Sequence, residues 1–353
     1  MKNKQRIVWI DILNIVACLG VLLLHCNHQS KGYDGEVTLG WIYGLIIYTI
    51  SYFPVPVFLM LSGCTLIGRC NSYQGGVKQF YRKRFNKTVI PFVFWSLFYF
   101  AFNLSVGWYE LDGLTQFISD FINARFNSHM WFFLPLFGIY LSLPFVEAML
   151  NNSSEKMELF FLLISFIFVS FLPMLCEITG IKYFIIGQES IQNYGMFSIA
   201  SNMLFYAVWG HFLNKTTLSV SWRKRIYLLG VLAAIAHFCG LYFLSLKDGS
   251  FNWAFLNYSY PTSVMMSVAV FVWFKNQDWD KLLSILHLDA SKISFVSSCS
   301  FGIYLIHRFI HNVGNHFGLP FQNPIYGFIL TYSVALIVII LMKKIPLINK
   351  IVP

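Results

Sequence analysis

The stretch WIDILNIVACLGVLLLHCNHQS, residues 9 to 30, is apolar except for a few side chains that could do chemistry. Asn14 and His25 stand eleven residues apart, so on an α-helix they share a face, about 20° apart around it and roughly 16 Å apart along it. Histidine exchanges a proton near neutral pH, which makes His25 the best general base in the chain. Asp11 extends this polar stripe but lies about 21 Å from His25, too far to orient the imidazole.

The same stripe also has a structural explanation. Asn and His side chains in apolar helices hydrogen-bond neighbouring helices and hold them together. Helix geometry alone does not separate this explanation from a catalytic one.

The overall composition indicates the environment of these residues. The chain of 353 residues is 57% hydrophobic and 11% charged, whereas soluble globular proteins carry roughly 25% charged residues. A water-facing surface cannot be built over so much apolar mass, so we expect the lipid bilayer to be the solvent. The seven cysteines contain no C-x-x-C pair and lie mostly in apolar runs. They are expected to be buried hydrophobes, with no disulfide framework and no metal site.

About ten stretches are long and apolar enough to cross the hydrocarbon as helices. We therefore predict an all-α, polytopic membrane bundle that forms a single domain over residues 1–353. Pro54 and Pro56 are expected to kink the second span. The predicted spans are 7–26, 41–67, 88–107, 131–150, 158–176, 195–213, 226–245, 258–275, 294–313 and 324–342.

The connectors between these spans predict their orientation. With both termini in the cytoplasm, the inner connectors hold most of the 25 lysines and arginines, as the positive-inside rule requires. This arrangement also accounts for the net charge of +10, so we expect no nucleic acid partner. The sequence has no Walker-type glycine loop, so ATP-driven transport by this chain is not expected.

Several stretches, in the right order, resemble the signatures of acyltransferase family 3, membrane enzymes that acylate sugars. In WIDILNIVACLGVLLLH, Asp11, Leu13 and His25 match the family pattern, but Asn14 stands where the family usually has a basic residue. The other stretches are VPVFLMLSG (55–63), FYRKRFNKTVIPFVFW (80–95), HMWFFLPLFGIYLSLP (129–144) and SFGIYLIH (300–307). The resemblance extends from residue 6 to about 342.

This resemblance implies transfer of an acyl group, usually acetyl from acetyl-CoA, to a hydroxyl of a cell-surface or lipid-linked polysaccharide. It implies an O-acetyltransferase of the bacterial plasma membrane, with acyl-CoA as donor substrate and no permanently bound cofactor. His25 would be the catalytic base. The expected donor-binding residues are Asn14, Arg82, Arg84 and Lys87, and the expected acceptor-binding residues are His129, Trp131, Tyr304, His307 and Arg308.

Alternatives remain at these positions. The basic residues also serve as orientation signals, Trp131 as an interfacial anchor, and His129 and Arg308 as structural groups. Asn14 has three explanations: the donor is held by Arg84, Lys87 or Arg6 instead, the donor differs from acetyl-CoA, or catalysis has been lost. We favour the first, because His25 and the later motifs remain. The alternative function is a membrane exporter or flippase of a glycan or lipid-linked sugar.

Overall fold

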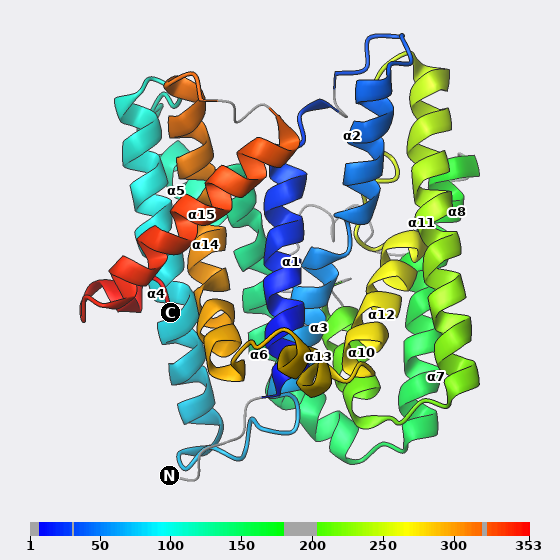
Figure 1. The fold of residues 1–353 in the computed structure, drawn as a ribbon. Coiled ribbons are helices and arrows are strands. Elements are labelled where there is room, and N and C mark those ends of the chain that lie inside the picture. The colour runs from blue at the N-terminus through cyan, green and yellow to red at the C-terminus, as the bar shows by residue number, and fades with distance from the viewer. Residues whose placement is uncertain (1–6, 30–31, 180–202, 320–322) are drawn as a thin grey trace.

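A computed structural model describes residues 7–29, 32–179, 203–319 and 323–353, and every regular element in these ranges is a helix (Figure 1). The expected all-α fold is therefore confirmed. The helices are α1 (Val8–Cys26), α2 (Leu39–Ile50), α3 (Pro54–Leu66), α4 (Gly76–Ser105), α5 (Gly113–Ile122), α6 (Phe133–Asn151), α7 (Glu155–Ser165), α8 (Leu172–Thr179), α10 (Leu204–Lys215), α11 (Val220–Asp248), α12 (Pro261–Lys275), α13 (Trp279–Ile285), α14 (Ala290–His316) and α15 (Pro324–Lys343). Short non-α helical segments are η2 (Ser128–Phe132), the π-helical η3 (Phe166–Phe171) and η4 (Ile348–Lys350).

Eight helical segments of the described chain are long and apolar enough to cross a membrane. Each of them overlaps a predicted span. The other two predicted spans, 195–213 and 258–275, contain the shorter helices α10 and α12, and residues 195–202 lie outside the described residues. A total of ten spans and the cytoplasmic position of both termini stay predictions.

The second predicted span is broken by its prolines. Helix α2 ends at Ile50 and α3 begins at Pro54, with Pro54 and Pro56 in the first turn of the new helix. Proline suits a first helical turn because its missing N–H has no partner there in any case. The chain thus changes direction between α2 and α3, which lie above and below each other in Figure 1.

Helices α1 and α14 lie side by side and are joined by polar contacts along their length. The contacts are Ser294 Oγ to Asp11 Oδ2 at 2.8 Å, Asn14 Nδ2 to Ser297 Oγ at 3.0 Å and Cys18 Sγ to Ser300 O at 3.5 Å. Each contact joins residues 282 or 283 positions apart in sequence, so the two helices run parallel. The polar stripe predicted on the first span therefore faces α14.

Helices α3 and α10 cross so closely that only glycine fits at the crossing. A Cβ atom on Gly63 would lie 1.8 Å from Ala207 O, and one on Gly210 would lie 1.9 Å from Met60 O. Small residues let membrane helices approach to backbone contact, where van der Waals packing drives their association. This crossing fixes α3, which forms one wall of the cavity described below.

Replacing Gly63 with alanine is expected to destabilise the protein by about 1–3 kcal/mol, because the backbones must separate to admit the methyl group. Thermal unfolding of the purified protein in detergent measures this effect. Gly40→Ala is the matched control, since a Cβ on this exposed helical glycine meets nothing closer than Thr38 Oγ1 at 3.9 Å. Equal melting temperatures for the two variants would contradict the close crossing.

Candidate active site

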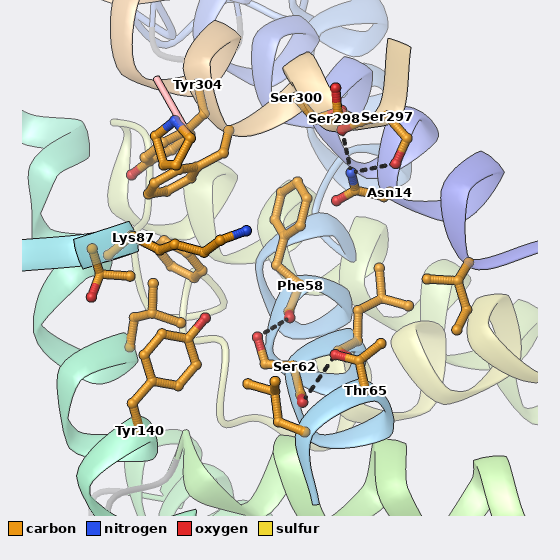
Figure 2. A pocket seen from close by; sticks show the side chains of 18 of the residues that line it. Asn14, Phe58, Ser62, Thr65, Lys87, Tyr140, Ser297, Ser298, Ser300 and Tyr304 are labelled. Atoms are coloured by element: carbon orange, nitrogen blue, oxygen red, sulfur yellow. Dashed lines mark hydrogen bonds between the residues drawn. The ribbon is translucent and has the colours of Figure 1, made fainter. Parts of the chain in front are cut away.

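A cavity of about 360 Å³ lies inside the bundle, between α1, α3, α4, α6 and α14 (Figure 2). At one end it is lined by polar and charged side chains from the N-terminal halves of α1 and α14 and from α4. At the other end it is lined mainly by aliphatic and aromatic side chains. The lining residues on α1 extend from Ile10 to Val21, which places the two ends roughly 16 Å apart along that helix.

The charged end of the cavity carries two of the basic residues expected to hold a donor. Lys87 extends into the cavity in Figure 2, and Arg84 belongs to the same lining. The Arg84 guanidinium lies 5.6 Å from the centroid of the Tyr140 ring, and its buried Nε has no hydrogen-bond partner in the part of the chain that the structure describes. Two cationic side chains, Arg84 and Lys87, therefore line this end of the cavity.

Arg82 does not line the charged end of this cavity. It is exposed, and it lines a separate, largely apolar groove together with Phe85 and Phe137. Arg84 lines both this groove and the central cavity, whereas Arg82 lines the groove alone. The structure thus brings Arg84 and Lys87 together and leaves Arg82 outside.

The other end of the cavity approaches a group of histidines. Val21 and Tyr304 belong to the lining, and His25 and His307 follow them by one helical turn on α1 and α14. The ring centroids of His25 and His307 lie 5.0 Å apart. His25 is half-buried, while His307 is only 1% exposed.

His129 lies against the same group but is held by its neighbours. Its ring centroid is 5.0 Å from that of His307. Its Nε2 donates to Leu305 O at 3.3 Å, and its Nδ1 lies 2.8 Å from Asn127 Oδ1. The Tyr304 hydroxyl donates to the His129 carbonyl. These contacts hold η2 against α14, so His129 has a structural role in this arrangement.

Trp131 and Arg308 lie beside this group and outside the cavity lining. The half-buried Trp131 stacks on Tyr258, with ring centroids 5.8 Å apart and planes at 17°. Arg308 is half-buried, and its Nε is a buried donor without a partner among the described residues. Buried donors of this kind are rare in proteins and often mark a functional role. Arg308 therefore has a donor available for a bound molecule.

A family model described as an acyltransferase domain matches residues 7–344, nearly the whole chain. The chain belongs to acyltransferase family 3. This confirms the resemblance found in the sequence, and together with the apolar helices it makes the protein a multi-pass membrane protein of an acyltransferase family. Comparisons with curated proteins and with solved structures give no match.

In this acyltransferase family 3 protein, Asn14 both contacts α14 and lines the cavity. Its Nδ2 donates to Ser297 O at 2.9 Å and to Ser297 Oγ at 3.0 Å, so it holds α1 against α14. It also lines the cavity near Lys87 (Figure 2). Arg6, the further basic candidate, lies outside the described residues.

The wall that α3 gives to the cavity was missed from the sequence. Ser62 donates to Phe58 O at 3.0 Å and Thr65 donates to Leu61 O at 2.7 Å, so both hydroxyls are satisfied within the helix. No charge or spacing distinguished them, and only their place in or just after the family-like stretch 55–63 could have found them. Tyr140 also lines the cavity.

Proposed function

We propose that this acyltransferase family 3 protein is an O-acyltransferase that moves an acetyl group from acetyl-CoA to a hydroxyl of a cell-surface or lipid-linked polysaccharide. One observation carries the proposal. A single cavity extends from the cationic pair Arg84 and Lys87 to Tyr304, one helical turn from the histidine group. A donor bound in it would have its charged part and its reactive part at the two chemically suitable ends.

The charged end suits the phosphates of coenzyme A. Lysine and arginine bind phosphate through charge-assisted hydrogen bonds. Asn14 and the hydroxyls of Ser62 and Thr65 lie on the same cavity and suit the amides of the pantetheine arm. That arm is long and thin, and a cavity roughly 16 Å long beside α1 could hold it in an extended form.

The reaction places His25 as the general base. Its imidazole removes the proton from the acceptor hydroxyl as the oxygen attacks the thioester carbonyl. The C–O bond forms, the tetrahedral oxyanion collapses with loss of the C–S bond, and the thiolate takes up a proton. Arg308, with its open Nε donor, is the group best suited to stabilise the oxyanion.

The acceptor would approach from the far side of the histidine group. Trp131 and the histidines at this end, with Arg308, are the proposed acceptor surface. Tyr304 and His129 would shape it rather than bind through their polar atoms, because the Tyr304 hydroxyl and both His129 ring nitrogens already contact protein atoms.

The direct test is mass spectrometry of envelope glycan from cells with and without the gene, together with transfer from radiolabelled acetyl-CoA by the protein in proteoliposomes. We expect a glycan acetyl group that depends on the gene and on acetyl-CoA. Retention of an unmodified glycan inside the cell, with no change in acylation, would contradict the proposal and favour an exporter.

Lys87→Ala should weaken coenzyme A binding by about 1.5–3 kcal/mol, roughly 10- to 100-fold, because a charged partner of a phosphate is lost. Isothermal titration of the purified protein with coenzyme A measures it. Arg82→Ala is the matched control, since Arg82 lies five residues earlier on α4 but outside the cavity lining, and it should bind as the wild type does. Equal losses in the two variants would contradict donor binding in this cavity.

A further inference from the structure

At and just beyond the C-terminal end of α1, two histidine pairs join this part of the chain to α14. His25 faces His307 with ring centroids 5.0 Å apart. One turn further on, His28 Nε2 lies 3.4 Å from His311 Nε2. The first pair lies next to the cavity, and the second includes the exposed His28. The sequence pattern did not reveal that the histidines of the two helices meet.

The hydrogen bond that His307 makes fixes its tautomer. Its Nδ1 lies 2.6 Å from Tyr304 O, and a carbonyl oxygen only accepts, so Nδ1 carries the proton. In the neutral ring, Nε2 then holds the lone pair. This Nε2 is buried and has no hydrogen-bond partner in the described parts of the chain. His307 thus keeps one ring nitrogen whose lone pair no described residue uses.

His129, the other buried histidine of this group, has no open ring nitrogen that could accept a proton. His129 already uses Nε2 to donate to Leu305 O, and its Nδ1 lies against Asn127 Oδ1. His307 also stands closest in sequence to the cavity lining on its helix, three residues after Tyr304. His307 is therefore in ring contact with His25 and one helical turn from the end of the cavity where the proposed thioester would sit.

We propose that His307 is a second catalytic residue, which carries the proton from His25 to the leaving thiolate of the donor. This inference rests on the proposed function. His25 accepts the hydroxyl proton as the new C–O bond forms. His307 Nε2 has no hydrogen-bond partner among the described residues, so the proton reaches it from His25 by way of a water molecule between the rings. His307 then delivers a proton to the sulfur as the C–S bond breaks. The proton that leaves the alcohol ends on coenzyme A, so no proton is taken from or released to solvent.

Two imidazoles suit a reaction whose substrates arrive from opposite ends. The acceptor hydroxyl would approach the half-buried His25, whereas the thioester would come along the cavity toward the buried His307. A single ring would have to turn between the two substrates within one reaction cycle. The Tyr304 carbonyl holds the His307 ring in one orientation, with its Nε2 open for a proton.

The test uses full-length protein in proteoliposomes with radiolabelled acetyl-CoA and isolated envelope glycan. His307→Gln is expected to lower the rate of transfer about 10- to 100-fold, with coenzyme A binding unchanged. His316→Gln, at the exposed end of α14, is the control and should keep the wild-type rate. His307→Ala leaves space for a small molecule, and added imidazole should restore part of its activity.

Wild-type rates in His307→Gln, or a slow His307→Ala that imidazole does not restore although coenzyme A still binds, would overturn the relay. Both results leave the proposed function standing if the wild type transfers acetyl. Absence of transfer by the wild type itself would instead overturn the proposed function, and the relay with it.

Discussion

His25→Ala is expected to abolish glycan acylation while the protein remains folded and inserted in the membrane. Removing a general base costs about 10²- to 10⁴-fold in rate, and the retained His307 cannot replace it if the acceptor meets His25 first. The half-buried side chain leaves only a small gap, so the bundle should persist. Acetyl content of the envelope glycan measures the loss in cells, and the proteoliposome assay measures the rate.

His316→Ala is the control for this prediction. His316 is an exposed histidine at the end of α14, so its removal should change neither the rate nor the glycan. Coenzyme A should still bind to His25→Ala, because the residues proposed to bind the donor, Arg84 and Lys87, line the other end of the cavity. An unchanged acetylated product from His25→Ala would reject this residue as the base.

The fold followed from the sequence because a bilayer imposes strong constraints on a chain. Backbone groups in hydrocarbon must be bonded internally, so long apolar runs become helices. The run at residues 7–26 became α1 almost residue for residue. Helix α4 was placed less well: it begins at Gly76, twelve residues before the predicted span, because its basic stretch continues the same helix beyond the apolar part.

The sequence could predict only those parts of the candidate site that depend on the geometry of a single helix. The spacing of Asn14 and His25 placed both on one face of α1, which the structure turns toward α14. Which residues of α14 they meet depends on the register of two helices almost 300 residues apart in sequence, and no local pattern sets that register. The pairing of His25 with His307 therefore had to come from the structure.

The basic cluster on α4 shows what helical spacing can predict. Arg82, Arg84 and Lys87 were expected to hold the donor together, and the structure places Arg84 and Lys87 in the lining of the central cavity and Arg82 outside that lining. Positions three apart on a helix share a face, which agrees with the placement of Arg84 and Lys87. Ser62 and Thr65 of α3 were harder to recognise from the sequence as cavity-lining residues, because serine and threonine are also common in membrane helices that line no cavity.

Ser62 offers the sharpest test of the cavity itself. Ser62→Phe would place a phenyl ring in a space of about 360 Å³ between α3 and the donor residues (Figure 2). The serine hydroxyl bonds only to Phe58 O among its described contacts, within the same helix, so its loss leaves no other helix without a partner. We expect coenzyme A binding and acetyl transfer to fall together by about 100-fold or more, because the donor no longer reaches the histidines.

Ser105→Phe separates this effect from a general cost of adding an aromatic ring. Ser105 also bonds a carbonyl of its own helix, Phe102 O at 2.8 Å, but it is exposed at the end of α4 and away from the cavity. Its variant should bind coenzyme A normally. If Ser62→Phe also bound coenzyme A normally and transferred acetyl at the wild-type rate, the donor could not run through this cavity. The placement of Lys87 and Arg84 as phosphate ligands would then fail as well, because both act from the same space.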